Sequence, residues 1–238
     1  EIRVPPIKFI NTAHKKIKQA TRVNDFDIEL LRRSIIHKDE FILALNKPAG
    51  LAVQGGSSTS RHIDAMLGGL KFEMQERPKL VHRLDKDTSG VLLLARTSEV
   101  ATYLTKAFKT RDVHKVYWAI VVGRPKHKNG KIDIPLQKRR GKFGEKTFPS
   151  KQGKRAVTFY RTVDQLNNIV TWLSLMPQTG RTHQLRAHCA DLGVPILSDG
   201  KYGGKKSFLL DFEENRLHLH AKAIKFPHPG GGFFQVIS

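Results

Sequence analysis

The stretch His82-Arg83-Leu84-Asp85-Lys86-Asp87-Thr88-Ser89-Gly90 places acids, bases and hydroxyls directly before the apolar run Val91 to Ala95. A strand needs only a turn before it, and an acid that points inward costs several kcal/mol unless it is paired. Functional residues concentrate in connecting segments that a rigid scaffold holds. A capped turn with solvated Arg and Lys side chains is the alternative interpretation, but the density of polar groups favours a functional site.

Composition bounds the class of protein. The chain has 238 residues, 39% of them apolar, which is enough for one sizeable core or for two joined halves that share a sheet. No window approaches the roughly 20 apolar residues that a membrane span needs. The lone Cys189 excludes a disulfide framework and is typical of a reducing compartment. Because the first residue is Glu1, we expect a processed or trimmed chain.

The charge predicts the partner. Lys and Arg number 42 against 21 Asp and Glu, which gives a formal net charge of +21. Such a surplus attracts polyanions, and nucleic acids are the commonest polyanions in cells. An anionic membrane is the alternative, but the sequence lacks a sustained basic helix with a bulky apolar face. We therefore expect the binding partner to be a nucleic acid.

Local patterns predict strands with isolated helices between them. The predicted strands cover 41–45, 91–95, 115–122, 157–160, 169–175 and 218–224, the fourth and fifth as an antiparallel pair. The predicted helices cover 61–67, a segment capped by Ser98 that includes Val100 to Phe108, and a segment from a cap at Thr179 or Thr182 to Asp191. Without regular alternation of strand and helix, this order favours an α+β fold with a mostly antiparallel sheet.

Two segments differ from the rest of the chain: the apolar residues at the N-terminus are poorly spaced, and residues 126–154 have few apolar residues to bury. Residues 1–40 are interpreted as an N-terminal arm that wraps the core or touches RNA, and residues 41–238 as the main domain. Within that domain, residues 126–154 form a basic insertion that contains Lys138-Arg139-Arg140-Gly141-Lys142-Phe143. The insertion is either a solvated loop or a mobile arm that binds phosphates, with Phe143 available to stack on a base.

Four separated blocks occur in a fixed order. They are Asn46-Lys47-Pro48-Ala49-Gly50-Leu51, the stretch 82–90, Lys115-Val116-Tyr117, and the stretch 180–188 that begins Gly-Arg-Thr-His-Gln-Leu-Arg. Together these blocks resemble the RluA-type RNA pseudouridine synthases over about residues 41 to 229. The resemblance implies the pseudouridine synthase catalytic fold, a long curved mostly antiparallel sheet with a central cleft, flanked by helices and loops. Residues 1–40 are too few for the complete S4 RNA-binding module that some relatives carry.

The implied reaction needs particular groups. Converting uridine to pseudouridine breaks the bond from N1 to the sugar and joins C5 to the same sugar carbon. A carboxylate beside the sugar can attack covalently or stabilise an oxocarbenium-like sugar. The resemblance implies that Asp85 is this catalytic residue, with Arg181 as the cation that keeps it ionised in a dry pocket. It implies that Tyr117 stacks on the base and is a candidate proton acceptor at C5; because a phenol is a poor base at neutral pH, positioning is its expected role.

A uridine in folded RNA must be flipped out to be reached, at a cost of a few kcal/mol. Arg83 precedes Asp85 by two residues, so both side chains point the same way in an extended segment. The resemblance implies that Arg83 fills the place that the base vacates; a surface Arg without a special role is the alternative. The predicted RNA-binding residues are His82, Arg83, Lys138, Arg139, Arg140 and Lys142.

Other chemistries fit the sequence less well. His183 and His188 do not share a helix face, and His218 and His220 lack a neighbouring Cys pair or HExxH spacing. No metal or cofactor is therefore predicted. Ser89 is not in a Gly-x-Ser-x-Gly context, which argues against a serine hydrolase. Two alternatives stay open: an RNA-binding or RNA-chaperone protein on the same fold, and a metal-assisted RNA hydrolase.

The remaining expectations concern context. We expect a monomeric isomerase that acts on ribosomal or transfer RNA, without an obligatory protein partner. The mitochondrial matrix is the predicted compartment, with cytoplasm and nucleus as alternatives. The segment Ser198-Asp199-Gly200 departs from relatives, which tend to have Gly before the Asp. It is interpreted as a peripheral loop that affects substrate choice and not the chemistry.

Overall fold

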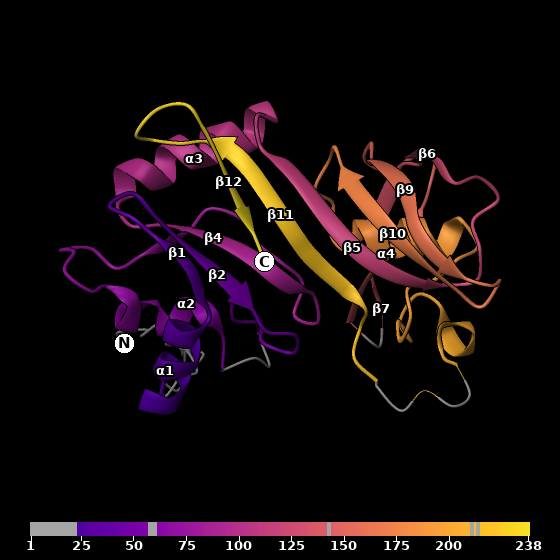
Figure 1. Cartoon of the computed structure of the whole chain (residues 1–238), viewed down its shortest axis with the longest axis horizontal. Coiled ribbons are helices and arrows are strands. Elements are labelled where there is room, and N and C mark those ends of the chain that lie inside the picture. The colour runs from indigo at the N-terminus through magenta and orange to yellow at the C-terminus, as the bar shows by residue number, and fades with distance from the viewer. Residues whose placement is uncertain (1–22, 57–60, 142–143, 210–211, 213–214) are drawn as a thin grey trace, which may run out of the picture.

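The computed structural model describes residues 23–56, 61–141, 144–209, 212 and 215–238. One ten-stranded sheet runs through the molecule, and a two-stranded hairpin stands beside it (Figure 1). The strands are β1 (Ile35–Lys38), β2 (Ile42–Lys47), β3 (Lys79–Leu80), β4 (Ser89–Ala95), β5 (His114–Val122), β6 (Asn129–Asp133), β7 (Leu136–Gly141), β8 (Gly144–Pro149), β9 (Val157–Leu166), β10 (Val170–Pro177), β11 (Leu219–Pro227) and β12 (Phe233–Ile237). The α-helices are α1 (Asp25–Arg33), α2 (Ile63–Met66), α3 (Ser98–Thr110) and α4 (Gln184–Asp191), and the 3-10 turns are η1 (Leu67–Leu70) and η2 (Gly204–Ser207).

The sheet has the order β1-β2-β4-β11-β5-β10-β9-β6, with β12 on β11 and β3 on β4. Its pairs are antiparallel except for β4 with β11, where Gly90 lies beside Ala221. Gly90 has φ +104°, and a Cβ there would lie 2.3 Å from the carbonyl oxygen of Ala221. Only glycine fits this position, so the close approach of two strands accounts for the glycine that ends the signature. The predicted α+β class with a mostly antiparallel sheet is confirmed.

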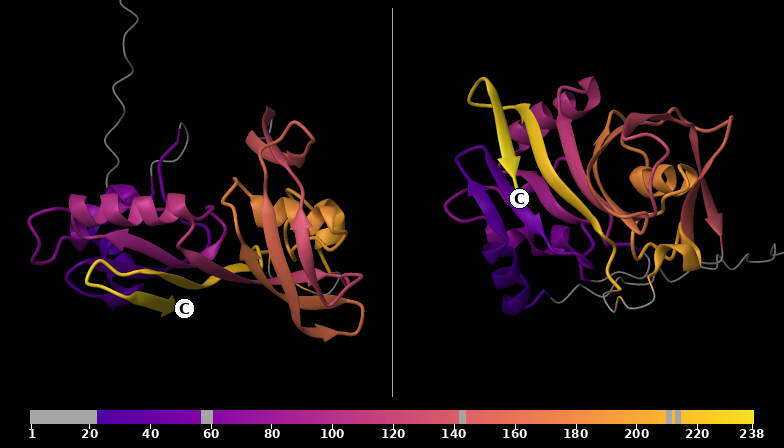
Figure 2. Two further views of the ribbon diagram at one scale, coloured as in Figure 1. Left: turned by 90° about the horizontal axis from the view of Figure 1, so that it is seen from above. Right: turned by 45° about the vertical axis from the view of Figure 1, so that its right-hand side comes forward.

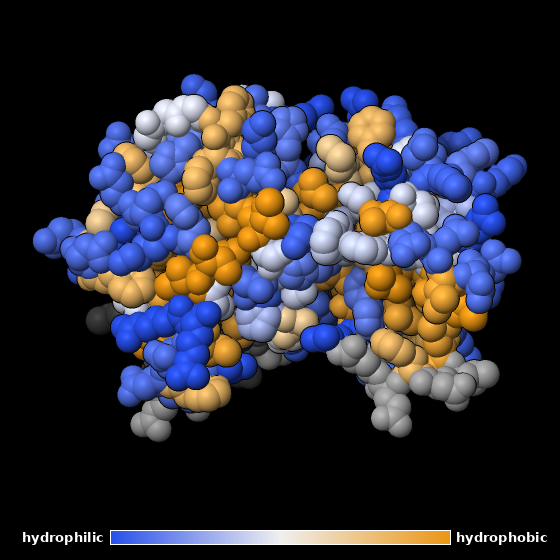
Figure 3. Space-filling view, viewed as in Figure 1, coloured by the Kyte–Doolittle hydropathy of each residue, from blue (hydrophilic) through white to orange (hydrophobic). Residues whose placement is uncertain are grey.

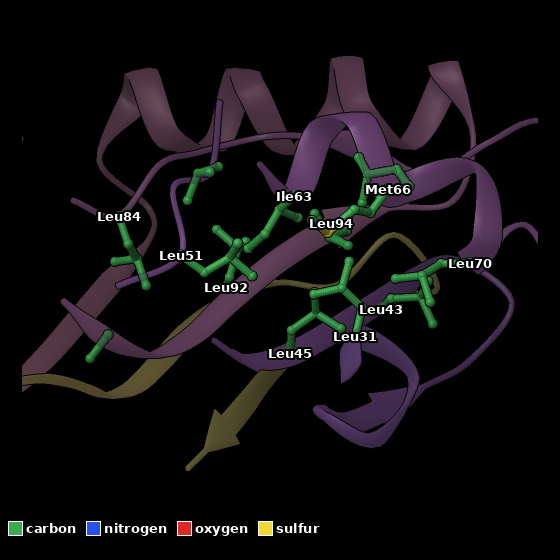
Figure 4. Close-up of a cluster of buried hydrophobic side chains, with 13 residues drawn as sticks. Leu31, Leu43, Leu45, Leu51, Ile63, Met66, Leu70, Leu84, Leu92 and Leu94 are labelled. Atoms are coloured by element: carbon green, nitrogen blue, oxygen red, sulfur yellow. The ribbon is translucent and has the colours of Figure 1, made fainter. Parts of the chain in front are cut away.

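Strand β4 is buried on both faces, which accounts for its unbroken apolar sequence. Leu92 and Leu94 point toward α1 and α2, in a cluster that also contains Leu43 and Leu45 of β2 (Figure 4). On the other face, Val91 and its neighbours pack with apolar residues of α3. The two hydrophobic clusters therefore pack on opposite faces of β4, the strand that directly follows the signature.

The second half of the molecule is built around α4. Strands β5, β10, β9 and β6 curve around this helix in the right-hand view of Figure 2. Leu185 and Cys189 of α4 pack with Val121 of β5 and Leu173 of β10. Because the helix is enclosed by the sheet, its residues from Gln184 to Cys189 are all buried.

The expected domain boundary at residue 41 does not coincide with a structural boundary. Strand β1 pairs with β2, and Leu31 of α1 is fully buried in the first core cluster. Residues 25–38 are therefore part of the main domain. The rest of the expected N-terminal arm, residues 1–22, lies outside the described residues.

The basic insertion was expected to be a solvated loop or a mobile arm, but it contains regular strands. Strand β6 joins the large sheet through β9, and β7 pairs with β8 as a hairpin. Ile132 and Leu136 are buried and anchor the segment. The hairpin projects from the sheet on the side where α3 lies (Figure 2, left). The side chains of residues 140–144, which include the expected contacts Arg140, Lys142 and Phe143, lie outside the described residues.

Two expected helix caps are wrong by one or more residues. Helix α3 is capped by Thr97, whose Oγ1 accepts a hydrogen bond from the Val100 N–H at 3.2 Å, while Ser98 is the first helical residue. At α4 the N-cap position is His183, in the left-handed region at φ +52°. Thr179 is instead occupied: its hydroxyl donates to Gln184 Oε1 and accepts from the Val157 N–H.

The surface is mostly hydrophilic, as expected for a chain with many charged residues. Hydrophilic residues cover most of both halves in Figure 3, with apolar residues in a band across the middle of this face. Within the described residues, no helix has the length and apolar character needed to cross a membrane.

Candidate active site

The described residues line two large clefts, and the signature carboxylate identifies the relevant one. A cleft of about 690 Å³ is lined by Asp85 together with Tyr117, Arg181 and Arg83. A larger cleft, of about 1270 Å³, is lined by Trp118 among others and does not contain Asp85. We assign the site to the smaller cleft because Asp85, Tyr117 and Arg181 line it together.

The first block anchors the loop that carries Asp85. Lys47 is fully buried, and its ammonium donates to the carbonyls of Pro48, Leu51 and Lys86 at 2.8–2.9 Å. The N–H of Gly50 donates to the same Lys86 carbonyl at 3.0 Å. Burial lowers the pKa of Lys47 to about 8, against the opposing charges of Asp87 and Asp85. The backbone next to Asp85 is thus held by two donors from another block.

Leu84 fixes the other side of this loop. It is 6% exposed and packs in the same cluster as Leu51 and Leu92 (Figure 4). Its neighbours Arg83 and Asp85 both line the cleft. The Thr88 N–H closes the turn by donating to the Asp85 carbonyl at 3.2 Å.

His82 lines the cleft, but its ring serves the fold. Its Nε2 accepts a hydrogen bond from the Leu93 N–H at 2.8 Å, and the ring stacks on Phe108 with centroids 4.9 Å apart. Burial, and then the charge of Lys115, lower the pKa of His82 to about 3. A buried neutral ring offers phosphate no positive charge, so this environment does not favour the predicted RNA contact.

Tyr117 of β5 lies in the electrostatic field of Asp85. Burial raises the pKa of the Tyr117 phenol well above its usual value of 10.0, and the negative charge of Asp85 raises it further. The phenol therefore keeps its proton at neutral pH. This favours the positioning role over the role of a base at C5.

Arg181 lines the cleft without pairing with Asp85 in this structure. The side chain is exposed, and its Nε donates to the carbonyl of Arg155 at 3.1 Å. Among the described residues, His183 faces Asp85, with Nε2 3.9 Å from Oδ1. The pairing of Asp85 with Arg181 that the resemblance implies would need the guanidinium to swing away from Arg155.

A buried ion pair stands behind the cleft. Arg186 of α4 donates from Nε and Nη2 to the two carboxylate oxygens of Asp199, at 2.8 and 2.6 Å, and both side chains are almost fully buried. Arg186 lines the cleft. Burial opposes the charge of its guanidinium, but the hydrogen bonds and charge of Asp199, and then the charge of Asp85, raise its pKa above the ordinary value. Arg186 lies in the fourth sequence block, three residues after His183, and its place in that block was the sequence feature that could have identified it as a cleft residue.

The predicted RNA-binding cations lie in two places. Arg83 is exposed at the cleft. Lys138 and Arg139 are exposed on β7, where Lys138 pairs with Glu145 of β8 at 2.5 Å. The hairpin connects to the cleft through Tyr202, whose hydroxyl accepts from the Thr147 N–H at 2.9 Å.

Comparison with known proteins identifies the family of this chain. The family model described as RNA pseudouridylate synthase matches residues 41–191. The chain belongs to this family. RNA pseudouridine synthase 4, mitochondrial, of Arabidopsis thaliana is 36% identical over 89% of the chain and 55% of its own length. Ribosomal large subunit pseudouridine synthase C of Rickettsia typhi is 43% identical over 75% of the chain and 59% of its own length. The chain therefore spans a little over half the length of these two relatives.

Solved structures of the family support the fold. The human protein RNA pseudouridylate synthase domain containing 4 superposes with a TM-score of 0.74 at 30% identity, covering 89% of this chain and 90% of that one. The human domain containing 1 protein gives 0.68 at 27% identity, with 86% and 82% covered. The predicted pseudouridine synthase catalytic fold is confirmed. Across the described residues, no group of three or more His, Cys, Asp or Glu is arranged to hold a metal ion.

The departure at Ser198 now has a physical account. Ser198 has φ +62°, a left-handed conformation that glycine adopts more readily than serine, so the glycine that the resemblance implies here would suit this backbone. The next residue, Asp199, is the buried partner of Arg186. Interpreting this segment as peripheral was wrong, because it supports a side chain that lines the cleft.

Proposed function

We propose that this chain isomerises uridine to pseudouridine in structured RNA, with Asp85 as the nucleophile or charge stabiliser. The observation that carries the proposal is the position of Asp85 in a cleft shared with Tyr117 and Arg181, in a chain that belongs to the pseudouridylate synthase family. The reaction breaks N1–C1′, forms C5–C1′, releases the proton on C5 and returns a proton to N1. It is redox-neutral and needs no second substrate.

The site supports a division of roles. Asp85 acts at the sugar or the base, and the protonated Tyr117 stacks on the uracil ring and excludes water. Arg181 turns toward the cleft when the nucleotide enters and stabilises the negative charge there. Arg83 occupies the gap left by the flipped nucleotide and contacts phosphate. The exposed cations of the β7–β8 hairpin bind the RNA backbone.

The relatives suggest the substrate and the compartment. The names of the Rickettsia proteins point to the large ribosomal subunit, so we propose ribosomal RNA as the first substrate to test, with transfer RNA as the second. The names of two plant relatives include mitochondrial, and we propose the mitochondrial matrix on that basis. Fractionation of cells that express the full-length protein would test the compartment.

The activity is tested by tritium release. The protein is incubated in excess EDTA with RNA transcripts labelled with tritium at C5 of uridine, and tritium transferred to water is counted. We expect release by the wild type and a loss of at least about 1,000-fold in Asp85→Asn. Asp87→Asn is the matched control, because it makes the same change at an exposed residue two positions away; it should retain release.

Binding is measured on the same variants by filter retention. Asp85→Asn should keep the affinity of the wild type, since the substitution removes a negative charge and no phosphate contact. Equal release from Asp85→Asn and wild type would contradict the role of Asp85. Tight binding without release from either RNA would favour the RNA-binding alternative, and release that EDTA abolishes would favour a metal-assisted reaction.

A further inference from the structure

His183 faces Asp85 across the cleft and lies outside the predicted set of site residues. Its Nε2 is 3.9 Å from Asp85 Oδ1, and the two side chains are 15% and 29% exposed. Its Nδ1 lies 2.9 Å from the Tyr202 hydroxyl. Its backbone is left-handed, at φ +52°, a conformation that is uncommon outside glycine. Residues in such conformations cluster at functional sites.

The contacts of Tyr202 select one form of the imidazole ring. The Tyr202 oxygen accepts a hydrogen bond from the Thr147 N–H at 2.9 Å, and its hydroxyl proton can be donated to Nδ1 of His183. The neutral ring then carries its own proton on Nε2, the atom that faces Asp85. The other tautomer would point a lone pair at the carboxylate and deprive the hydroxyl proton of this acceptor.

The surroundings also favour an uncharged ring. Burial lowers the pKa of His183 below its usual value of 6.5, the charges of Arg186 and Lys201 lower it further, and Asp85 and Asp199 oppose them. A neutral donor can orient a carboxylate without cancelling its charge.

We propose that His183 is a positioning residue for Asp85, with an Nε2–H donor that Tyr202 sets in place. The inference rests on the proposed function. At 3.9 Å the contact is electrostatic, and a small rotation of the Asp85 side chain brings the atoms within hydrogen-bond distance. Because Thr147 is in β8, the chain Thr147–Tyr202–His183 also links the basic hairpin to the carboxylate.

Two substitutions of His183 separate this role from a structural one. In His183→Gln the amide nitrogen takes the place of Nε2 and keeps a donor toward Asp85. In His183→Asn the shorter amide takes the place of Nδ1, so it keeps the contact with Tyr202 and loses the donor. We expect kcat to fall less than about tenfold in the Gln variant and about 10- to 100-fold in the Asn variant, with KM within about threefold of wild type in both.

A structural role predicts the opposite order. Asn adopts the left-handed conformation at position 183 far more readily than Gln, so a residue needed only for its backbone would tolerate Asn better. Greater kcat in His183→Asn than in His183→Gln would therefore overturn the proposal, as would equal kcat values in both variants and the wild type.

The tautomer is measured independently of activity by nitrogen NMR of the His183 ring in the wild type. We expect the proton on Nε2, and loss of this preference in Tyr202→Phe, which removes the hydroxyl and keeps the ring that packs on Arg186. A proton on Nδ1 in the wild type would overturn the inference even in an active enzyme. Absence of tritium release from the wild type would instead overturn the proposed function, with the tautomer still deciding the arrangement at His183.

Discussion

The ring of His82 accepts a hydrogen bond from the Leu93 N–H, stacks on Phe108 and has a pKa of about 3 because of burial. A His whose pKa is lower in the folded state than its usual 6.5 contributes stability that is complete above pH 6.5. That contribution is lost as the pH falls toward 3, because protons then bind the unfolded chain preferentially. The signature histidine should therefore make the protein sensitive to acid.

We test this with His82→Gln, whose side-chain oxygen can accept from the Leu93 N–H and does not titrate. Between pH 7 and pH 5 the free energy of unfolding should fall by about 2 kcal/mol more in the wild type than in the variant. Urea unfolding at a series of pH values measures the difference. Parallel pH profiles for the two proteins would show that the ring is not held in its neutral form.

Single residues differ in how far the sequence reveals them. Asp85, Tyr117 and Arg181, the three residues that the resemblance implied, line one cleft, and each lies in a motif of fixed order. The resemblance gave no account of His183, whose importance depends on a left-handed backbone and on a partner, Tyr202, that lies outside all four blocks. The direction of the Arg181 side chain is likewise a matter of local packing that no motif encodes.

The start of α3 gives a prediction at the level of an element. The Thr97 hydroxyl accepts from the Val100 N–H, one of the donors that a helix leaves unpaired at its first turn. Thr97→Ala should lower the free energy of unfolding by about 1 kcal/mol. Ser98→Ala should cost less than about half of that, because Ser98 is exposed and its hydroxyl contacts Glu76 at the surface. Chemical denaturation of both variants tests the order, and a larger loss in Ser98→Ala would return the cap to Ser98.

The elements that the sequence predicted are those with long apolar runs. Strands β2, β4, β5, β9, β10 and β11 all match predicted strands, since burial on one or both faces leaves a periodic trace. Strands β6, β7 and β8 were missed because they carry few apolar residues. Their formation depends on pairing and on isolated anchors such as Ile132 and Leu136, which no local pattern separates from a loop.

At the level of the whole molecule, the excess of 21 positive charges makes RNA binding depend on released counterions. The contribution of each cation follows from its neighbours in the fold. Lys138 is already paired with Glu145, whereas Arg139 lies on the same strand opposite Lys146. A cation with an acidic partner releases fewer counterions when a phosphate replaces that partner. Counting charges in the sequence therefore overstates how much such a cation contributes to the salt dependence of binding.

This argument predicts graded salt dependence. In the Asp85→Asn background, which prevents turnover, Arg139→Ala should reduce the slope of log affinity against log salt by about 1, and Lys138→Ala by less. Lys225→Ala is the control: Lys225 is an exposed cation on β11 that stacks over Phe233, outside the residues that line either cleft. Its slope should equal that of the parent. Fluorescence anisotropy over a range of potassium concentrations measures all four proteins, and equal slopes for Arg139→Ala and Lys225→Ala would show that the hairpin makes no phosphate contact of its own.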